Sequence, residues 1–362
     1  MTFFVKYFQD GLIHELEILL ACNAAPPVRR IASRAMASLF SKGNPYGAYQ
    51  IINKCNDLLK LKEDGKEIGQ RLFALEVIAT LYSELGRLLG SCFPDTVFSL
   101  LKCLRLSELS RSECLDAIRH LLVGLEGSAS MKHAEIYKNV RPFMTSNDWR
   151  VRSSAALCVG QLAKQFSQLV IQNEVEGLFQ LAMKQMSEPK SREGFSILIA
   201  NISLAVLDNT IKLPTGNAKL RKPTRDELFH YLKLSFVTGH CVQKREIFKA
   251  DVSSQNVKAG LADCHVHLVR GLGSSWLEQN LTLFLNHLLN IATEPKTTQT
   301  HQDALFTCRQ IKTILSQTID QLLSEKAQLQ AIKILGSFIH QHRADNDIQT
   351  GHVLVIAIQV RV

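Results

Sequence analysis

Apolar residues recur along the chain at helical spacing, and the stripes that they form follow regularly placed arginines. After Arg152, small or apolar residues occupy the third, sixth, seventh and tenth following positions, as Ala155, Cys158, Val159 and Leu162. Positions at this spacing share one face of an α-helix. The pattern therefore predicts an amphipathic helix that begins near Arg152 and buries one face.

The same stripe follows five arginines at a nearly constant interval. These arginines lie 42, 40, 41 and 40 residues apart along the chain: Arg29, Arg71, Arg111, Arg152 and Arg192. A second amphipathic segment precedes each stripe, as at residues 93–104 and 175–186. Two helices in about 41 residues is the period of HEAT and armadillo arrays. We therefore expect an all-α fold, a right-handed α-solenoid of HEAT-type helical hairpins.

The repeat rhythm divides the chain into three parts of one continuous solenoid. Residues 1–206 hold the N-terminal HEAT repeats, and residues 258–362 hold further repeats, because the stripe restarts after Lys258. Residues 207–257 are predominantly polar and predict a loop-rich insertion between repeats. The insertion contains the most concentrated basic feature of the chain: Lys212, Lys219, Arg221, Lys222 and Arg225. This basic cluster is either a solvated loop or a contact for an acidic peptide or an anionic membrane surface.

A positive charge in the first turn of a helix opposes the helix dipole, so the repeat arginines need a structural reason. Glu67, Asp148 and Glu188 lie four residues before their arginines, and Glu108 lies three before. We hypothesise that each carboxylate accepts from the amides at the helix start and pairs with the arginine of its own or a neighbouring repeat. Stacked repeats then form a ladder of such pairs. In the alternative interpretation, the arginines are simply solvated.

Composition indicates a folded protein without membrane or secretion signals. Hydrophobic residues make up 46% of the 362 residues and charged residues 21%. Charged residues interrupt the N-terminal segment, and no run of 18 apolar residues occurs, so we expect neither a signal peptide nor a membrane span. Nine cysteines are scattered without a CxxC pair. They are typical of reduced, mostly buried thiols, so we expect a cytoplasmic protein.

The candidate chemistry of the chain is weak. Cys264 and His265 in the stretch DCHVH fall on the apolar stripe after Lys258, so we expect them in the core. The alternative is a zinc site that recruits His267 together with His240 and Cys241 upstream. The sequence contains neither a defensible nucleophile–base arrangement nor a glycine-rich phosphate loop. We therefore predict no enzymatic activity, no catalytic or metal-binding residues and no cofactor.

A net charge of +9 permits a second class of function. A helical-repeat protein with a sequence pI near 9.1 could associate with nucleic acid through a basic surface. The positive charge is dispersed, however, and aromatic residues make up only 7% of the chain, without a stacking ladder interleaved with arginine. Nucleic-acid binding therefore remains the alternative to a protein-binding scaffold.

Several stretches resemble the N-terminal region of the HEAT repeat-containing protein 5 family. They are GRLLGSCFPDTVFSLLKCL at residues 86–104, IYKNVRPFMT at 136–145, THQDALFTCRQIKTIL at 300–315 and LLSEKAQ at 322–328. KCNDLLK at residues 54–60 and GSSWLEQNLTLFLNHLLNI at 273–291 are similar to further repeats of the family. The resemblance is collinear from about Pro26 to Gln359. These strings are more specific than a general HEAT consensus.

This resemblance implies a very long, non-enzymatic α-solenoid of the cytosol. Members of the family accompany the clathrin adaptor complex of the trans-Golgi network and endosomes, with aftiphilin and γ-synergin as co-subunits. The implied role is a scaffold in vesicle traffic, including retrograde transport from endosomes to the Golgi. Membrane association is then peripheral, through protein partners, and no nucleic acid is expected. The family offers no short motif that can be mapped onto individual residues here.

The resemblance ends at Gln359 and is followed by Val360, Arg361 and Val362. Family chains are several times longer, so this sequence resembles an N-terminal portion that is truncated at the C-terminus. We hypothesise that the last three residues are intron read-through or an incomplete gene model. If the chain is truncated, its last helix exposes an apolar face where the next repeat would stack.

Overall fold

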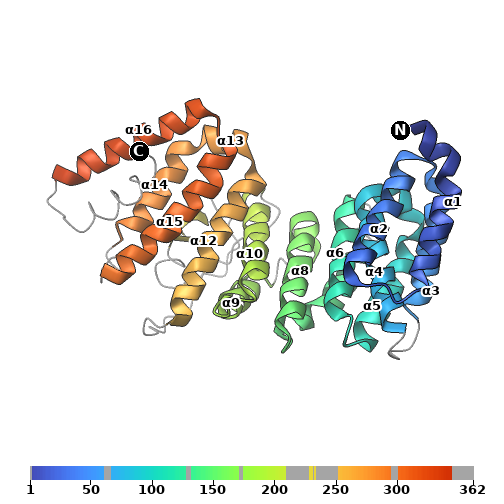
Figure 1. The fold of residues 1–362 in the computed structure, drawn as a ribbon. Helices are drawn as coiled ribbons and strands as arrows, with labels where there is room; N and C mark the ends of the chain where they lie inside the picture. Colours follow the sequence, from blue (N-terminus) through green and yellow to red (C-terminus); the bar gives the residue numbers. More distant parts are fainter. Residues whose placement is uncertain are drawn as a thin grey trace. The chain divides into compact units, whose positions relative to one another are not determined.

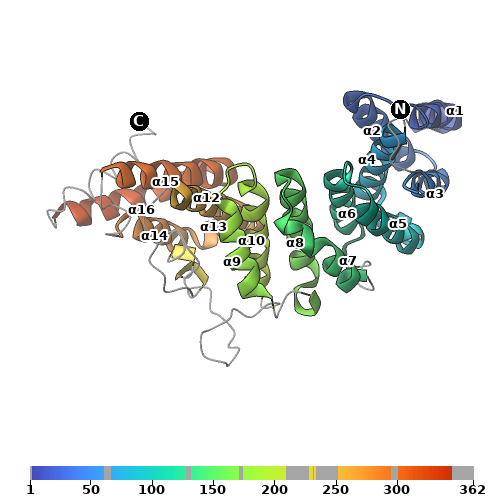
Figure 2. The same ribbon diagram turned by 90° about the horizontal axis from the view of Figure 1, so that it is seen from below.

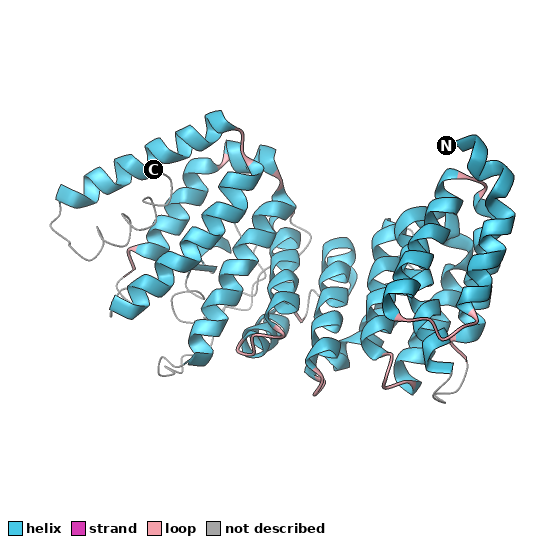
Figure 3. Cartoon of the chain, in the orientation of Figure 1, coloured by secondary structure: helices cyan, strands magenta, loops and turns pink. Residues whose placement is uncertain are grey.

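A computed structural model describes residues 2–60, 67–127, 132–170, 174–208, 228–230, 232–233, 252–294 and 301–344. Within these ranges the regular elements are helices and no strand occurs (Figure 3). The predicted all-α class is therefore confirmed. The chain divides into two units, Met1–Val170 and Ile171–Val362. We call them unit one and unit two and describe each by itself.

The described residues of unit one form four consecutive pairs of helices, most of which are labelled in Figure 1. The first and second helix of each pair, in chain order, are α1 (Thr2–Leu20) and α2 (Pro26–Lys42), α3 (Ala48–Leu58) and α4 (Glu67–Leu85), α5 (Phe93–Leu106) and α6 (Arg111–Leu125), and α7 (His133–Val140) and α8 (Trp149–Val170). Short 3₁₀ helices adjoin them: η1 (Pro45–Gly47), η2 (Gly86–Cys92) and η4 (Arg141–Thr145). This is the two-helix repeat that the arginine spacing predicts.

The pairs stack so that their helices form two layers. The second helices α2, α4, α6 and α8 pack side by side in chain order, and the first helices α3, α5 and α7 form the other layer (Figure 2). Helices α3, α5 and α7 also pack against the second helices of their own pairs, which are α4, α6 and α8. Each helix from α3 to α8 therefore has neighbours along its layer and across it, and the core runs between the layers.

The predicted apolar stripes line this core. All four stripe positions are buried after Arg71, Arg111 and Arg152 in unit one, and after Arg192 in unit two. In α2, the stripe positions Ala32 and Met36 are buried, whereas Ala35 and Leu39 are partly exposed. The first repeat of a stack has a neighbour on one side only, so its stripe is less completely covered.

Unit two repeats the same arrangement. Helix α9 (Val175–Met186) pairs with α10 (Arg192–Leu207), and α12 (Val252–Leu272) packs between α10 and α15 (His301–Leu322). The remaining helices are α13 (Ser274–Gln279), α14 (Leu281–Ala292) and α16 (Glu325–Ala344), and α16 packs against α14 and α15. Helix α12 already begins at Val252, inside the segment that the sequence predicts to be an insertion. The described residues 228–230 and 232–233 of that segment are also helical.

No helix in the described ranges combines the length and the apolar content that a membrane crossing requires. The longest, α8 and α15, carry charged or polar residues on the face opposite their buried stripe. Such amphipathic helices bury one face against a neighbour and leave the other in water.

Two glycines allow a close backbone approach between neighbouring repeats. Gly86 follows the end of α4 with φ of +48°, a left-handed conformation that strongly favours glycine. Gly124 lies near the end of α6, where an added Cβ would collide with the carbonyl oxygen of Tyr82. A Cβ on Gly86 would in turn meet the carbonyl of Gly124. The backbones of two repeats therefore touch directly at this point.

We expect Gly124→Ala to lower the free energy of unfolding by about 1–3 kcal/mol, because backbone atoms cannot move aside as a flexible side chain can. Gly90→Ala is the matched control in the same unit, since a Cβ there meets nothing within 4 Å. Urea unfolding of both variants measures the difference. Equal stability of the two variants would show that the helices separate at little cost.

Candidate functional site

The five repeat arginines occupy equivalent places in five second helices. Arg111 and Arg192 are the first residues of α6 and α10, and the other three lie in the first or second turn of α2, α4 and α8. Arg71 and Arg152 are only 3% and 7% exposed. The solvated-arginine interpretation is therefore wrong for these two side chains.

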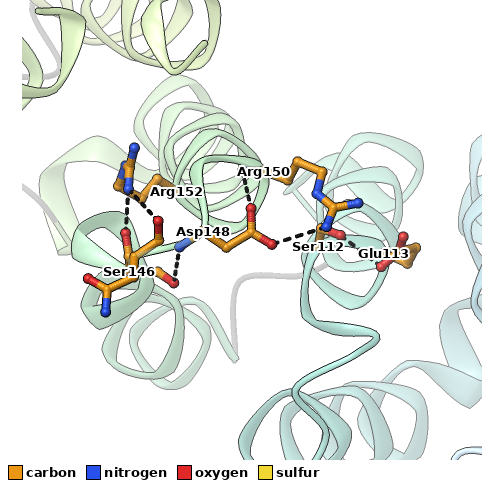
Figure 4. A network of polar contacts seen from close by, with 7 residues as sticks. Ser112, Glu113, Ser146, Asp148, Arg150 and Arg152 are labelled. Atoms are coloured by element: carbon orange, nitrogen blue, oxygen red, sulfur yellow. Dashed lines mark hydrogen bonds and ion pairs between the residues drawn. The ribbon is translucent and has the colours of Figure 1, made fainter. Parts of the chain in front are cut away.

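Arg152 binds the turn that connects the two helices of its own repeat. Its Nη1 donates to the carbonyl oxygens of Ser146 at 2.7 Å and Asn147 at 3.1 Å (Figure 4). Arg29 repeats this contact, because its Nη1 donates to the carbonyl of Ala24 at 3.1 Å. Hydrogen bonds to charged groups contribute about 1.5–3 kcal/mol, and the unfavourable helix dipole costs only about 0.3–1 kcal/mol. These bonds therefore outweigh the dipole and keep arginine at this position.

The predicted carboxylate partners are present at some arginines and differ at others. Arg111 Nη1 lies 3.3 Å from Glu108 Oε1, as the sequence predicts. The guanidinium of Arg111 also lies over the ring of Phe143 in the next repeat, 5.3 Å from its centroid. Arg192 pairs at 3.0 Å with Asp263 of α12, whereas the sequence predicts Glu188 as its partner. Both arginines thus connect neighbouring repeats.

Asp148 contacts a different arginine from the one that the ladder hypothesis assigns to it. Its Oδ1 accepts from the backbone amide of Arg150 at 2.9 Å, and its Oδ2 lies 3.4 Å from the Arg150 guanidinium (Figure 4). Asp148 therefore binds the start of α8, as predicted. Figure 4 shows the Arg150 side chain pointing toward Ser112 and Glu113 at the start of α6 in the preceding repeat.

The basic cluster of the insertion, Lys212, Lys219, Arg221, Lys222 and Arg225, lies outside the residues that the structure describes. His240 and Cys241, the upstream residues of the alternative zinc site, also lie outside them. Their predicted roles stay predictions.

Cys264 and His265 are core residues of α12, as the apolar stripe predicts, and both are fully buried. His265 Nδ1 lies 2.6 Å from the Leu261 carbonyl, and His265 Nε2 lies 2.9 Å from Nε2 of His287 in α14. Within the described ranges, no three histidine, cysteine or carboxylate side chains gather as a metal site requires.

This histidine pair has one consistent protonation pattern. A carbonyl only accepts, so Nδ1 of His265 carries the proton and its Nε2 accepts from His287. Burial lowers the pKa of His265 below its ordinary value of 6.5. Burial, followed by the neighbouring His265 and Lys233, lowers the pKa of His287 well below the same value. The folded unit therefore favours two neutral rings, with Phe229 against His287 at 4.8 Å between ring centroids.

A row of polar side chains crosses the second-helix layer of unit one. Nine residues after each repeat arginine, the four second helices carry Ser38, Thr80, His120 and Gln161. All four side chains are partly exposed. We call this set the polar row. The predicted buried stripe does not include this offset, although the same register identifies it.

His120 of the polar row contacts Ser83 of α4, but the two side chains do not form a catalytic pair. His120 Nδ1 lies 2.7 Å from Ser83 Oγ, and His120 Nε2 lies 2.9 Å from Arg119 Nη2. Arginine only donates, so Nε2 accepts and the neutral ring carries its proton on Nδ1, which donates to Ser83. Burial and then the Arg119 charge lower the pKa of His120. The imidazole therefore cannot take the Ser83 proton, and the contact links α4 to α6.

Comparison with known proteins identifies HEAT-type sequence in unit one. A HEAT repeat family model matches residues 136–166, which cover the last part of α7, η4 and most of α8. Protein SWEETIE of Arabidopsis thaliana is 29% identical over 146 residues, which cover 39% of this chain and 6% of that protein. Together with the helical pairs, the family match shows that residues 136–166 carry a HEAT repeat.

Solved structures of two proteins are similar at low identity. The crystal structure of Kap121p is 14% identical with a TM-score of 0.49, over 97% of this chain and 33% of that chain. Importin beta is 12% identical with a TM-score of 0.46, over 94% of this chain and 44% of that one. This chain thus spans less than half the length of each of these proteins.

We expect Arg152→Leu to lower the free energy of unfolding by about 1–3 kcal/mol, because two turn carbonyls lose a charged donor. Arg150→Leu, two residues away, is the matched control. Its side chain is 63% exposed and pairs with a half-exposed carboxylate, so its loss costs less than about 1 kcal/mol. Urea unfolding followed by fluorescence of the adjacent Trp149 measures both. A similar loss of unfolding free energy in both variants would contradict the role of Arg152 in binding the turn carbonyls.

Acid should destabilise unit two through the His265–His287 pair. A histidine whose folded pKa lies below 6.5 contributes stability that is present above pH 6.5 and lost as the pH falls below it. The wild-type chain should therefore lose unfolding free energy when the pH is lowered from about 7.5 to about 5.5, and replacing both histidines with Gln should make this loss smaller. Urea unfolding, read from Trp276 beside Phe229, measures this loss. His14→Gln, at an exposed position of α1, should leave the pH dependence unchanged.

Proposed function

We propose that this chain is a non-enzymatic scaffold that binds an extended segment of a partner protein on the second-helix layer of unit one. The observation that carries the proposal is the polar row, in which Ser38, Thr80, His120 and Gln161 repeat at one register on four adjacent helices. Repeat proteins bind extended partners by distributing contacts over such surfaces.

The spacing of the polar row fits an extended polypeptide. Adjacent packed helices lie about 8–10 Å apart, and an extended chain advances about 3.3 Å per residue. One residue in three of a bound segment would therefore face a row side chain. Gln161 makes no hydrogen bond to another described residue, and Thr80 donates to the Glu76 carbonyl while keeping its oxygen lone pairs. Amide and hydroxyl groups can both donate to and accept from a peptide backbone.

The partner class follows from the resemblance to the HEAT repeat-containing protein 5 family. We propose that the chain accompanies the clathrin adaptor complex of the trans-Golgi network and endosomes, together with aftiphilin-like and γ-synergin-like subunits. It would then act in vesicle traffic as a cytoplasmic protein that reaches membranes through these partners. The collinear resemblance from about Pro26 to Gln359 supports this proposal, and the HEAT repeat at residues 136–166 is consistent with it.

The basic cluster of the insertion supplies a second contact in this proposal. Five cations within residues 212–225 attract an acidic partner segment or an anionic surface, by about 1 kcal/mol for each charge near a membrane. Such attraction adds to binding at the polar row only when both contacts reach the same partner.

We expect the purified 362-residue chain to bind immobilised clathrin adaptor complex with its two co-subunits. Thr80→Arg with Gln161→Arg should weaken this binding about tenfold, which corresponds to about 1.4 kcal/mol, because both side chains block the polar row. Gln50→Arg with Asn53→Arg is the control, since these residues are exposed on α3 in the other layer. Reversing the five charges of the basic cluster should also weaken binding without changing thermal stability.

The outcomes separate the parts of the proposal. Binding that survives the polar-row variant excludes that surface as the site. Failure of the wild-type chain to bind the adaptor excludes the trafficking partner. Steep salt-dependent retention on RNA or DNA instead would favour the nucleic-acid alternative.

A further inference from the structure

Helix α5 carries a row of large exposed side chains that the fold does not need. Phe98 is 60% exposed and Leu106 is 70% exposed, and Leu109 in the following turn is 69% exposed. Lys102 and Arg105 are exposed between them. Offsets of four, seven and eight residues from Phe98 place these side chains on one face of the helix. We call the five residues the α5 ridge.

The buried face of α5 is complete without the ridge. Val97, Leu100, Leu101 and Leu104 point into the core between the layers and are at most 1% exposed. Single exposed apolar residues are normal on protein surfaces, but here two lie on one helical face with two cations between them, and a third, Leu109, lies in the following turn. Leaving them in water is unfavourable, so a surface that covers them would stabilise the bound state.

The ridge has excess positive charge. Arg105 donates from Nε to the Leu101 carbonyl at 3.2 Å, and its remaining guanidinium donors stay available. Lys102 has no ion-pair partner among the described residues. Glu108 is engaged by Arg111 at 3.3 Å. The single acidic residue of α5 is Asp95 in its first turn, so the ridge faces solvent as an apolar and cationic surface.

The geometry points to an anionic lipid bilayer as the surface that the α5 ridge contacts. Phe98 and Leu106 lie about 12 Å apart along the helix, at 1.5 Å per residue. A flat bilayer surface can therefore contact Phe98 and Leu106 at the same time. Their apolar side chains then enter the boundary between headgroups and acyl chains, while Lys102 and Arg105 stay with the lipid phosphates.

A lipid surface fits the ridge better than an acidic peptide does. A bound peptide helix lays its apolar face into a hydrophobic groove, whereas here the apolar side chains are themselves the outermost groups of the helix. The next first helix, α7, adds Lys138, which is exposed and makes no ion pair within the described ranges. The contact is independent of the polar row, which lies on the other layer.

Flotation with phosphatidylcholine vesicles, with or without phosphatidylserine, tests the contact. The full chain should bind only the vesicles with phosphatidylserine. Replacing Phe98, Leu106 and Leu109 with Ser should weaken this binding about tenfold. Lys102→Glu with Arg105→Glu should do the same. All five positions are exposed, so thermal unfolding should stay unchanged. Tyr46→Ser with Ile31→Ser is the control, because these two residues are 76% and 70% exposed elsewhere in unit one.

A spectroscopic probe distinguishes insertion from simple charge attraction, including attraction at the basic cluster. The fluorescence of Phe98→Trp should shift to the blue on phosphatidylserine vesicles, whereas that of Tyr46→Trp should not. Absence of wild-type binding to either vesicle overturns the inference, as does binding that the ridge variants leave intact. Soluble polyglutamate tests the acidic-peptide alternative. If the chain binds polyglutamate, and the charge variant abolishes this binding while the apolar variant leaves it unchanged, the ridge is a site for an acidic peptide and the lipid inference is wrong.

Discussion

The structure depends on one constraint, which is that a single pair of helices cannot bury its own apolar face. The stripes of α4 and α6 are fully covered because each of these helices has a partner across the layers and a second helix on either side. In α2, whose layer continues on one side only, Ala35 and Leu39 stay partly exposed. Stability in such arrays is the sum of repeat and interface contributions, so each interface carries part of the fold.

The interfaces are fixed by polar groups at particular points as well as by apolar contact. Arg152 and Arg29 bind carbonyls of the turn inside their own repeats, whereas Arg111 and Arg192 reach the next repeat through Phe143 and Asp263. An arginine at one register position therefore acts either within a repeat or between repeats, according to which acceptor the local packing places near it. In both cases it joins the start of a second helix to a neighbouring segment.

This regular stacking creates two different surfaces on unit one. Second helices held in line present the polar row, whose members come from four helices and share no local sequence motif. The first-helix layer presents the α5 ridge, which comes from one helix and its following turn. A scaffold with a polypeptide surface on one layer and a lipid surface on the other could hold a partner next to a membrane.

The sequence by itself determined the helices, their pairing period and their buried faces, because these depend on residues three and four positions apart. It also placed Cys264 and His265 in the core correctly. Only the tertiary structure decided which groups meet: Asp148 with Arg150 in place of Arg152, His265 with His287, and Ser83 with His120. The two histidine contacts join residues 22 and 37 positions apart on separate helices. Helical periodicity carries no information about such pairs, since side-chain length and the offset between packed helices decide them.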